Sequence, residues 1–289
     1  MRALSLIRVA LIASALCLLF PLSAQARPLR VVATISTIAS LALPVAGGDA
    51  VVTTLVPVGA SPEDYQPSPA DIVKLREADI LVENGAGLEA WLERTIASAK
   101  NPALRIVVCT DGLPVRDQNP HLWMDPNFAR FYVLKIAGAL EAADPHHSVS
   151  YANRARAYDK TLVSLLERTN QKIQTIPPPN RTMIVYHNAW EYYTRRFGLN
   201  LIGVLETSPG REPSPSQVAH LVDLARRYHV RAVFAEPEYS PKLAQALASS
   251  AGIKTVVNLY DDSVGTDPRV ADYVGMIDYD TDVIVSALK

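Results

Sequence analysis

The stretch from Ser148 to Ile176, SVSYANRARAYDKTLVSLLERTNQKIQTI, decides the predicted fold because it contains neither glycine nor proline. Residues suited to one buried face recur in it at intervals of three or four: Tyr151, Ala155, Tyr158, Leu162, Leu165, Thr169 and Ile173. That spacing predicts a single amphipathic helix, which at 1.5 Å per residue would be roughly 40 Å long. The triplet Pro177-Pro178-Pro179 ends it.

Short apolar, β-branched segments alternate with longer helical patterns on both sides of this helix. Before it, we expect strands at 29–35, 51–56, 80–83 and 106–109, and helices at 38–45, 69–77, 88–99 and 126–142. After it, we expect strands at 182–186, 199–205, 232–235 and 255–259, and helices at 189–197, 215–227, 241–251 and 270–288. Such alternation predicts parallel sheets covered by helices on both faces.

The predicted fold class is therefore α/β, with two lobes, each a mainly parallel sheet flanked by helices, joined by one long rigid helix. The N-terminal α/β lobe would comprise residues 27–147, the linking helix 148–176 and the C-terminal α/β lobe 177–289. A short repeat fits this organisation, since Pro67-Ser68-Pro69 and Pro213-Ser214-Pro215 each precede a helical pattern and then a short strand. Serine followed by proline also begins many unrelated helices, so duplication and chance stay equal alternatives.

The N-terminus has the pattern of a secretory signal peptide. Arg2 and Arg8 precede an apolar run from Val9 to Phe20, and Ala24-Gln25-Ala26 forms a small-residue cleavage site. We therefore expect residues 1–26 to be removed and the mature chain to be periplasmic. The run is shorter than the roughly 20 residues that span a bilayer, and Cys17 lacks a small residue before it. We expect no stable membrane anchor.

The composition of the mature chain argues against a disulfide-stabilised protein and against a nucleic-acid-binding protein. Only Cys109 remains after cleavage, so no intrachain disulfide can form and the fold depends on its core. Loss of Arg2 and Arg8 changes the formal charge from −1 to −3. Because the chain has no basic run, we expect no nucleic-acid partner, and we expect a monomer.

Acidic and histidine side chains follow four of the predicted strands. Parallel sheets bind ligands in the loops beyond the carboxyl ends of their strands, and these loops carry Glu63 and Asp64, His121, His187, and Asp261 and Asp262. Prolines at 120 and 126 restrict the loop of His121. Two of the loops belong to each lobe, so these side chains meet only if the lobes face each other across a cleft.

The other histidines, His146, His147, His220 and His229, lie on or beside helices and are expected at the surface. The sequence contains no His-Glu-x-x-His, no Cys-x-x-Cys and no Gly-x-Ser-x-Gly motif, so an enzyme has little support.

Motifs in a fixed order along the mature chain resemble those of one protein family. The matching stretches are Val31–Ile35, Leu55–Gly59, Tyr65–Asp71, Glu83–Gly85, Asn119–Pro126, His187–Ala189, Phe197–Leu199, Glu212–Pro215, Glu236–Ser240 and Tyr273–Leu288. Together they resemble the metal-binding solute-binding proteins of zinc and manganese ABC transporters, the cluster A-I or TroA-like family. The resemblance implies two lobes bridged by a rigid helix, one divalent metal in the cleft, and an ABC permease with its ATPase as partners.

The resemblance also implies a set of metal ligands. The family's second ligand corresponds to His121, its third to His187, and its fourth, in a Leu-Tyr-x-Asp setting, to Asp262. At the first position the chain departs from the family, because Ser61-Pro62-Glu63 stands where Asp-Pro-His is usual. Glu63 takes the place of the histidine, and Asp64 is the alternative.

The replacement of the usual histidine by Glu63 affects which metal the site is expected to favour. Two imidazoles and two carboxylates form a harder donor set than three imidazoles and one carboxylate, which favours manganese or ferrous iron. The general affinity order favours zinc, so zinc stays possible. A metal-binding surface adhesin or structural protein is the alternative function, and a secreted zinc hydrolase is a weaker one. Glu236 and Arg211 are interpreted as surface ion-pairing residues, with a place behind the ligands as the alternative.

Overall fold

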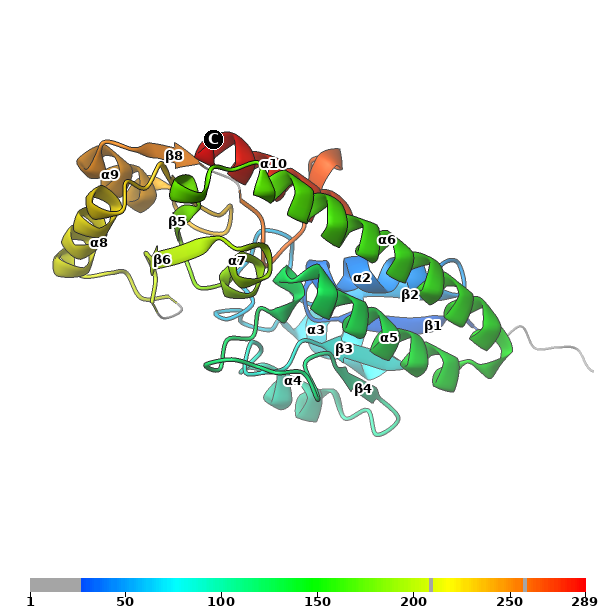
Figure 1. The fold of residues 1–289 in the computed structure, drawn as a ribbon. Helices are drawn as coiled ribbons and strands as arrows, with labels where there is room; N and C mark the ends of the chain where they lie inside the picture. The colour runs from blue at the N-terminus through cyan, green and yellow to red at the C-terminus, as the bar shows by residue number, and fades with distance from the viewer. Residues whose placement is uncertain (1–26, 208–209, 257–258) are drawn as a thin grey trace, which may run out of the picture.

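The computed structural model describes residues 27–207, 210–256 and 259–289, and the predicted signal peptide, 1–26, lies outside them. The described chain forms two four-stranded parallel sheets (Figure 1). The first sheet has the order β2-β1-β3-β4, with strands Leu29–Ala33 (β1), Ala50–Thr54 (β2), Ile80–Glu83 (β3) and Arg105–Val108 (β4). Its helices are Ser36–Ala46 (α2), Pro69–Glu77 (α3), Leu92–Ala99 (α4) and Pro126–Ala143 (α5), with a 3₁₀ turn at Leu122–Met124 (η1).

The second sheet has the order β6-β5-β7-β8, with strands Thr182–Val185 (β5), Asn200–Val204 (β6), Ala232–Phe234 (β7) and Lys254–Val256 (β8). Its helices are Glu191–Phe197 (α7), Pro215–Arg227 (α8), Lys242–Ala251 (α9) and Tyr273–Leu288 (α10). Further 3₁₀ turns lie at Pro145–His147 (η2), Pro178–Asn180 (η3) and Pro268–Val270 (η4). Two parallel sheets flanked by helices confirm the predicted fold class.

The two lobes repeat one arrangement of strands and helices. In each sheet the first strand pairs with the second and the third, and the fourth lies at the far edge. Helices α3 and α8 both follow the second strand of their lobe and both begin at a Pro-Ser-Pro triplet. In α3 the amide of Ser68 donates to Asp71 (2.9 Å), and in α8 that of Ser214 donates to Gln217 (2.7 Å). The two helices therefore occupy equivalent positions in their lobes and begin with the same capping pattern.

One long helix, Ser148–Gln174 (α6), connects the lobes and ends two residues before the predicted Ile176. It packs on α2 and α5 of the first lobe and on α7 and α10 of the second. In Figure 1, α10 runs beside the end of α6, and there Arg168 Nη2 lies 2.6 Å from Asp278 Oδ2. The long helix therefore fixes elements of both lobes.

A single apolar core extends from the first sheet through α6 to the second sheet and α10. A smaller cluster lies among α8, α9 and the second sheet. Because close-packed interiors resist deformation, a shared core limits hinge bending between the lobes. The exact division at residues 147 and 176 stays a prediction.

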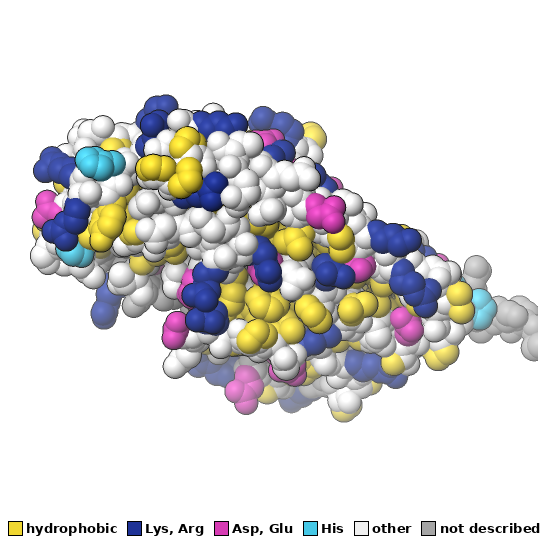
Figure 2. Space-filling model, in the orientation of Figure 1, with side chains coloured by type: hydrophobic (Ala, Val, Ile, Leu, Met, Phe, Trp, Pro, Cys, Tyr) yellow, Lys and Arg dark blue, Asp and Glu magenta, His cyan; other side chains and the backbone are white. Residues whose placement is uncertain are grey.

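The surface mixes charged and apolar side chains. Figure 2 shows basic and acidic residues interspersed over one face, with apolar side chains gathered near its middle. Phe131 and Leu134 of α5 are 44% and 53% exposed. Among the helices of residues 27–207, 210–256 and 259–289, none is both long and apolar enough to cross a membrane.

Candidate metal centre

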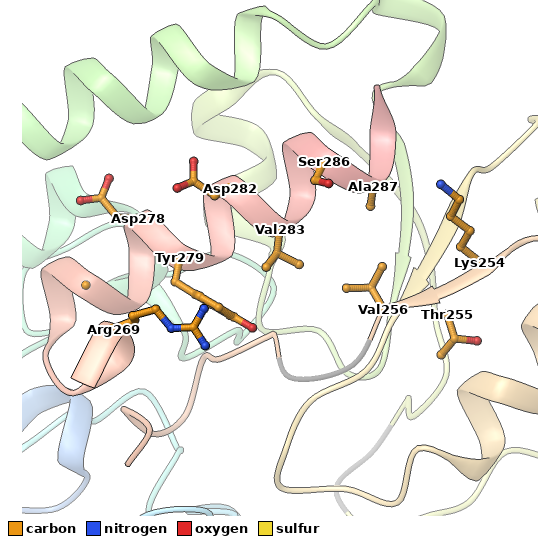
Figure 3. Close-up of a pocket in the computed structure, with 11 residues that line it drawn as sticks. Lys254, Thr255, Val256, Arg269, Asp278, Tyr279, Asp282, Val283, Ser286 and Ala287 are labelled. Atoms are coloured by element: carbon orange, nitrogen blue, oxygen red, sulfur yellow. The ribbon is translucent and has the colours of Figure 1, made fainter. Parts of the chain in front are cut away.

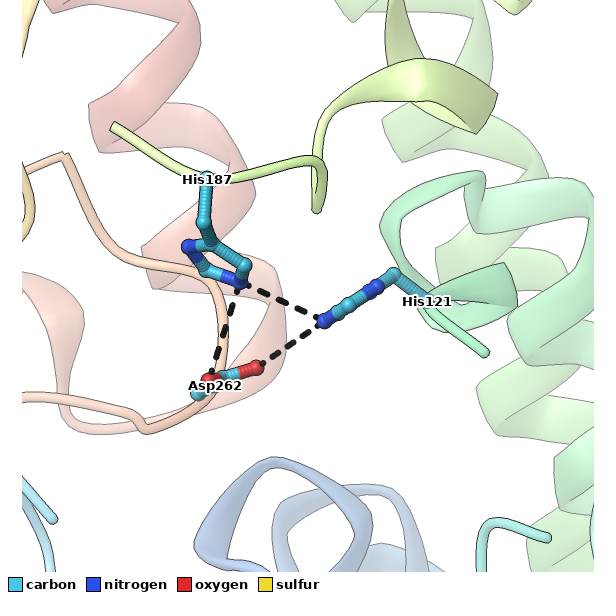
Figure 4. A group of neighbouring side chains, drawn as sticks. All are labelled: His121, His187 and Asp262. Atoms are coloured by element: carbon cyan, nitrogen blue, oxygen red, sulfur yellow. Dashed lines mark hydrogen bonds and ion pairs between the residues drawn. The ribbon is translucent and has the colours of Figure 1, made fainter. Parts of the chain in front are cut away.

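Three of the four predicted ligands converge between the lobes (Figure 4). His121 precedes η1, His187 follows β5, and Asp262 lies in the loop after β8. The two Nε2 atoms of the histidines lie 3.3 Å apart. Asp262 Oδ1 lies 3.6 Å from His121 Nε2, and Oδ2 lies 3.8 Å from His187 Nε2. All three side chains are buried.

These separations suit one shared cation. Two imidazole nitrogens bound to zinc at about 2.05 Å with a tetrahedral angle would lie about 3.3 Å apart. The observed Nε2 to Nε2 distance is 3.3 Å, so the two rings need little movement to share an ion.

Asp262 provides the strongest sign that a cation belongs here. Its side chain is fully buried, and neither carboxylate oxygen has a hydrogen-bond partner among the described residues. Burial, reinforced by the carboxylate of Asp261, raises its pKa well above the usual range. An unpartnered buried carboxylate costs free energy unless a cation compensates it. The residues present therefore fit a divalent metal.

A side-chain amide orients His121. Its Nδ1 lies 2.9 Å from Asn119 Oδ1, and Asn119 Nδ2 donates to the carbonyl of Asn188 at 2.7 Å. Because an amide oxygen accepts only, Nδ1 carries the proton and the Nε2 lone pair faces His187 and Asp262. Burial, with a smaller contribution from His187, lowers the pKa of His121 well below its usual range. A neutral imidazole is the form that binds metal.

A carboxylate orients His187. Its Nδ1 lies 2.5 Å from Glu236 Oε2, and Glu236 is only 2% exposed. Burial alone would lower the pKa of His187, but the carboxylates of Asp261 and Asp262 raise it overall. Carboxylate and histidine pairs of this kind fix the ring and strengthen the imidazole as a metal ligand.

The interpretation of Glu236 as a surface ion-pairing residue was therefore wrong. The same rule that found the other residues applies to it, because Glu236 lies just beyond the carboxyl end of β7. Arg211 is exposed, as expected for a surface residue.

Asp261 is a second buried acid that the sequence reasoning did not single out. Its carboxylate accepts from the Trp190 indole N–H (3.1 Å) and from the amide of Asp262 (2.6 Å). Its carbonyl accepts from the Trp123 indole N–H at 2.9 Å. Asp261 thus holds the backbone that presents Asp262, and its contact with tryptophans of two different segments anchors that loop.

Glu63 lies at the mouth of the site rather than inside the group of three. It lines a cavity of about 180 Å³ together with His121, His187 and Glu206. Its side chain is half-buried, and its carboxylate makes no hydrogen bond to any described residue. The Trp91 indole N–H donates to the carbonyl of Pro62 at 2.7 Å, which fixes the neighbouring backbone.

Burial raises the pKa of Glu63, while the positive field of His187 opposes that rise. Asp64, the alternative ligand, is exposed and does not line this cavity. Of the two acids, Glu63 is the one that faces the histidines.

The remaining histidines lie elsewhere. His146, His220 and His229 are exposed, and His147 Nδ1 pairs with Asp144 Oδ2 at 2.6 Å beside the start of α6.

A cavity of about 870 Å³ is separate from these residues and lies between β8 and α10 (Figure 3). Arg269 lies over the ring of Tyr279 there, 5.3 Å from its centroid. The acids of this cavity are already paired, Asp278 with Arg168 and Asp282 with Lys172. Because no histidine lines it, this cavity offers no comparable set of donors.

Sequence comparison identifies related proteins over nearly the whole described chain. The family model for "Zinc-uptake complex component A periplasmic" matches residues 31–287. The "Iron-binding protein YfeA" of Yersinia pestis is 32% identical over 270 residues, which cover 91% of this chain and 87% of that protein. The "Manganese-binding lipoprotein MntA" of Halalkalibacterium halodurans is 29% identical over 266 residues, covering 90% and 89%.

Solved structures with the same architecture bind metals. The periplasmic zinc-binding protein TroA of Treponema pallidum aligns with a TM-score of 0.85 and 25% identity, covering 90% of this chain and 99% of that one. The Mn-bound periplasmic metal-binding protein of Candidatus Liberibacter asiaticus gives 0.81 and 26%, covering 90% and 100%.

Proposed function

Because the chain belongs to the zinc-uptake complex component A family of periplasmic proteins, we propose that it captures a divalent transition-metal ion and delivers it to an ABC permease for import. Relatives named for manganese and for iron, and a structural neighbour named for zinc, support a metal of this class as the transported ligand. The ion is cargo, and no chemistry on it is required.

Two imidazole nitrogens 3.3 Å apart face a buried carboxylate that has no hydrogen-bond partner in the described part of the chain, and this arrangement supports the function most directly. We assign His121, His187 and Asp262 as ligands, with Glu63 as the fourth from the mouth of the cavity. A set of two imidazoles and two carboxylates favours manganese or ferrous iron, and zinc remains a competitor through its higher intrinsic affinity.

Capture would involve small local movements. The lobes share one apolar core, and hydrogen bonds join them around the site: Thr37 to the carbonyl of Asp262 (3.1 Å), and Gly59 N to Ser263 Oγ (3.2 Å). Such contacts leave the side chains at the mouth, Glu63 above all, as the part free to adjust when an ion enters.

The protein would act outside the cytoplasmic membrane, with a permease and its ATPase as partners. Several relatives are named as lipoproteins. In this chain Leu16 precedes Cys17, so we propose cleavage after Ala26 and an unanchored periplasmic form. N-terminal sequencing of the secreted protein tests this, and an acylated Cys17 at the N-terminus would refute it.

We further propose a purely binding role. Four protein donors would fill the tetrahedral shell of zinc and leave no position for the activated water that a hydrolase needs. Peptidase and esterase assays of the zinc-loaded protein test this role, and zinc-dependent turnover would contradict it.

Titration of metal-stripped protein with Mn²⁺, Fe²⁺ and Zn²⁺, combined with elemental analysis, tests the function. The parent should bind one equivalent, and His121→Ala should lose tight binding of all three metals. His220→Ala, which removes an exposed histidine from α8, is the matched control and should bind like the parent. Native-like binding by His121→Ala would exclude His121 as a ligand.

Glu63 can be tested in the same assay. Glu63→His should shift selectivity towards zinc, because it restores the family's usual imidazole and removes one negative charge. Glu63→Ala should weaken every metal. If both variants bind like the parent, Glu63 is not a ligand.

A further inference from the structure

A second carboxylate faces the metal cavity from the C-terminal lobe. Glu206 is 7% exposed and lines the same cavity as Glu63, His121 and His187. It follows β6 directly, and β6 pairs in parallel with β5, which leads to His187. The amide of Glu206 donates to the carbonyl of Tyr186 at 2.7 Å, so Glu206 lies beside His187 at the carboxyl edge of the sheet.

The backbone fixes one end of this carboxylate. The amide of Gly210 donates to Glu206 Oε1 at 2.5 Å. A β-carbon at Gly210 would lie 3.2 Å from Asp64 Oδ2, so Gly210, whose amide holds Glu206, lies close to the residue that follows Glu63. Glu206 and Glu63 thus come from opposite lobes to one cavity.

No side chain of the described residues pairs directly with these two acids, although the charge of His187 acts on both. Neither Glu63 nor Glu206 forms a salt bridge with a lysine, arginine or histidine in the described part of the chain. Asp262, beside the two histidines, is buried, and its carboxylate has no hydrogen-bond partner among the described residues. Two like charges that face each other in a partly desolvated cavity repel unless a cation lies between them.

We infer that Glu206 is a further metal-binding residue and a determinant of selectivity, contacting the cation together with Glu63. The inference rests on the proposed function and extends its ligand set to two imidazoles and three carboxylates. Zinc is satisfied by four donors in a tetrahedron, whereas manganese takes more ligands and prefers oxygen. Glu206 would therefore contribute to the binding of Mn²⁺ and Fe²⁺ and little to that of Zn²⁺.

The test compares Glu206→Gln with the parent by titration of the metal-stripped, full-length mature protein with Mn²⁺, Fe²⁺ and Zn²⁺. Glutamine keeps the shape and can still accept from Gly210, but it removes the charge. Affinity for Mn²⁺ and Fe²⁺ should fall by at least about 10-fold and that for Zn²⁺ by less than about 3-fold, because four donors remain for zinc. Glu206→Asp should recover part of the manganese affinity.

Glu212→Gln is the matched control, because Glu212 is an exposed acid a few residues further along the chain. It should bind all three metals like the parent. X-ray absorption of the Mn²⁺ complex provides a second readout, and Glu206→Gln should change the oxygen shell around the metal.

Unchanged affinities in Glu206→Gln, or an equal loss for all three metals, would overturn the role of Glu206 in selectivity. Failure of the proposed function looks different, because the parent itself would then bind none of the metals and His121→Ala would change nothing. Circular dichroism of the metal-free variants separates either result from misfolding.

Discussion

The two lobes surround the metal site with two unlike groups of residues, which we call walls. We define the N-terminal wall as Asn119, His121 and Glu63, and the C-terminal wall as His187, Glu236, Asp261 and Asp262. An amide holds the histidine of the first wall, and a carboxylate holds that of the second. The only acid of the first wall is half-buried, whereas the three acids of the second are at most 2% exposed.

The difference affects the protonation of the two rings. Burial lowers the pKa of His121, whereas the nearby carboxylates raise that of His187 despite its burial. Buried carboxylates without cationic partners raise the free energy of the metal-free fold. The C-terminal wall therefore carries the acids whose negative charge a bound cation neutralises. The N-terminal wall supplies a neutral imidazole as donor and, at the mouth of the cavity, an acid whose side chain can adjust.

Asp262→Asn should produce the largest effect, because it removes charge from the centre of the C-terminal wall. We expect metal affinity to fall by more than about 100-fold, beyond the usual effect of losing a residue behind the ligands. The metal-free variant should be more stable than the metal-free parent by about 1 kcal/mol, since burial raises the pKa of Asp262 and the parent must either bury a charge or take up a proton there, which an amide avoids.

Calorimetric titration and thermal melts of Asp262→Asn measure both quantities. A loss of metal affinity together with a gain in metal-free stability would support the view that this wall carries the negative charge that the cation neutralises. A variant that loses both would mean that Asp262 stabilises the fold without any ion.

Glu236→Gln tests the orienting partner of His187 and should have an intermediate effect. The amide keeps a hydrogen bond to Nδ1 but no longer strengthens the imidazole as a donor, so affinity should fall about 10- to 100-fold. Competition with a metal-sensitive dye measures this loss of metal affinity. Affinity equal to that of the parent would show that the carboxylate adds nothing beyond its shape.

Asn119→Ala makes the corresponding change in the N-terminal wall and should cost less than Glu236→Gln, about 10-fold at most. The ring of His121 remains restricted by Pro120 and by the bond from Asn84 Nδ2 to the Pro120 carbonyl (2.9 Å). The same dye competition measures the metal affinity of Asn119→Ala. A loss larger than that of Glu236→Gln would reverse the comparison between the walls.

Glu83 is a half-buried acid of the N-terminal lobe that lies outside the metal cavity, and its substitution should show the smallest effect. Burial, with repulsion from Glu89, raises the pKa of Glu83 to about 7. The folded state therefore keeps a proton that the unfolded chain releases, so this residue destabilises the fold increasingly as pH rises from about 4.5 to 7. Below that window the carboxyl is neutral in both states.

Glu83→Gln should raise the stability at pH 8 by about 1 kcal/mol, a value reduced for solvent screening of a half-buried group. At pH 4 it should change nothing, and metal affinity should stay at the parent value. Melting curves at the two pH values test this. A pH-independent change in stability would point to altered packing instead of titration.

Local signals in the sequence predict much of this fold. Helices α3 and α8 begin and end at the predicted residues, because Pro-Ser-Pro marks each start. The boundaries of β1 to β7 differ from the predicted ones by up to two residues, since extended pairing continues past the strand ends: Leu55 N still donates to the carbonyl of Ala33 at 3.0 Å. The predicted strand 255–259 lies partly outside the described residues.

Part of the candidate site is also predictable from the sequence, because the predicted strands show where the loops of the site begin. Positions at strand ends bring His121, His187 and Asp262 together, because parallel strands end at one edge. The orienting roles of Asn119 and Glu236 depend on burial, which a local pattern does not encode. Glu236 also contacts a histidine 49 residues away in the chain, and no local pattern encodes that contact either. Glu63 remains the least determined residue, since a half-buried side chain has several rotamers open to it.

Anomalous diffraction from crystals of the manganese-loaded protein tests the central claim most directly. We expect one strong peak between the lobes, bounded by the Nε2 atoms of His121 and His187 and by the carboxylate of Asp262. Its distances to these atoms should be about 2.0–2.3 Å. A peak elsewhere, for instance at His147 and Asp144, with none among these three side chains, would contradict the assignment of the metal site.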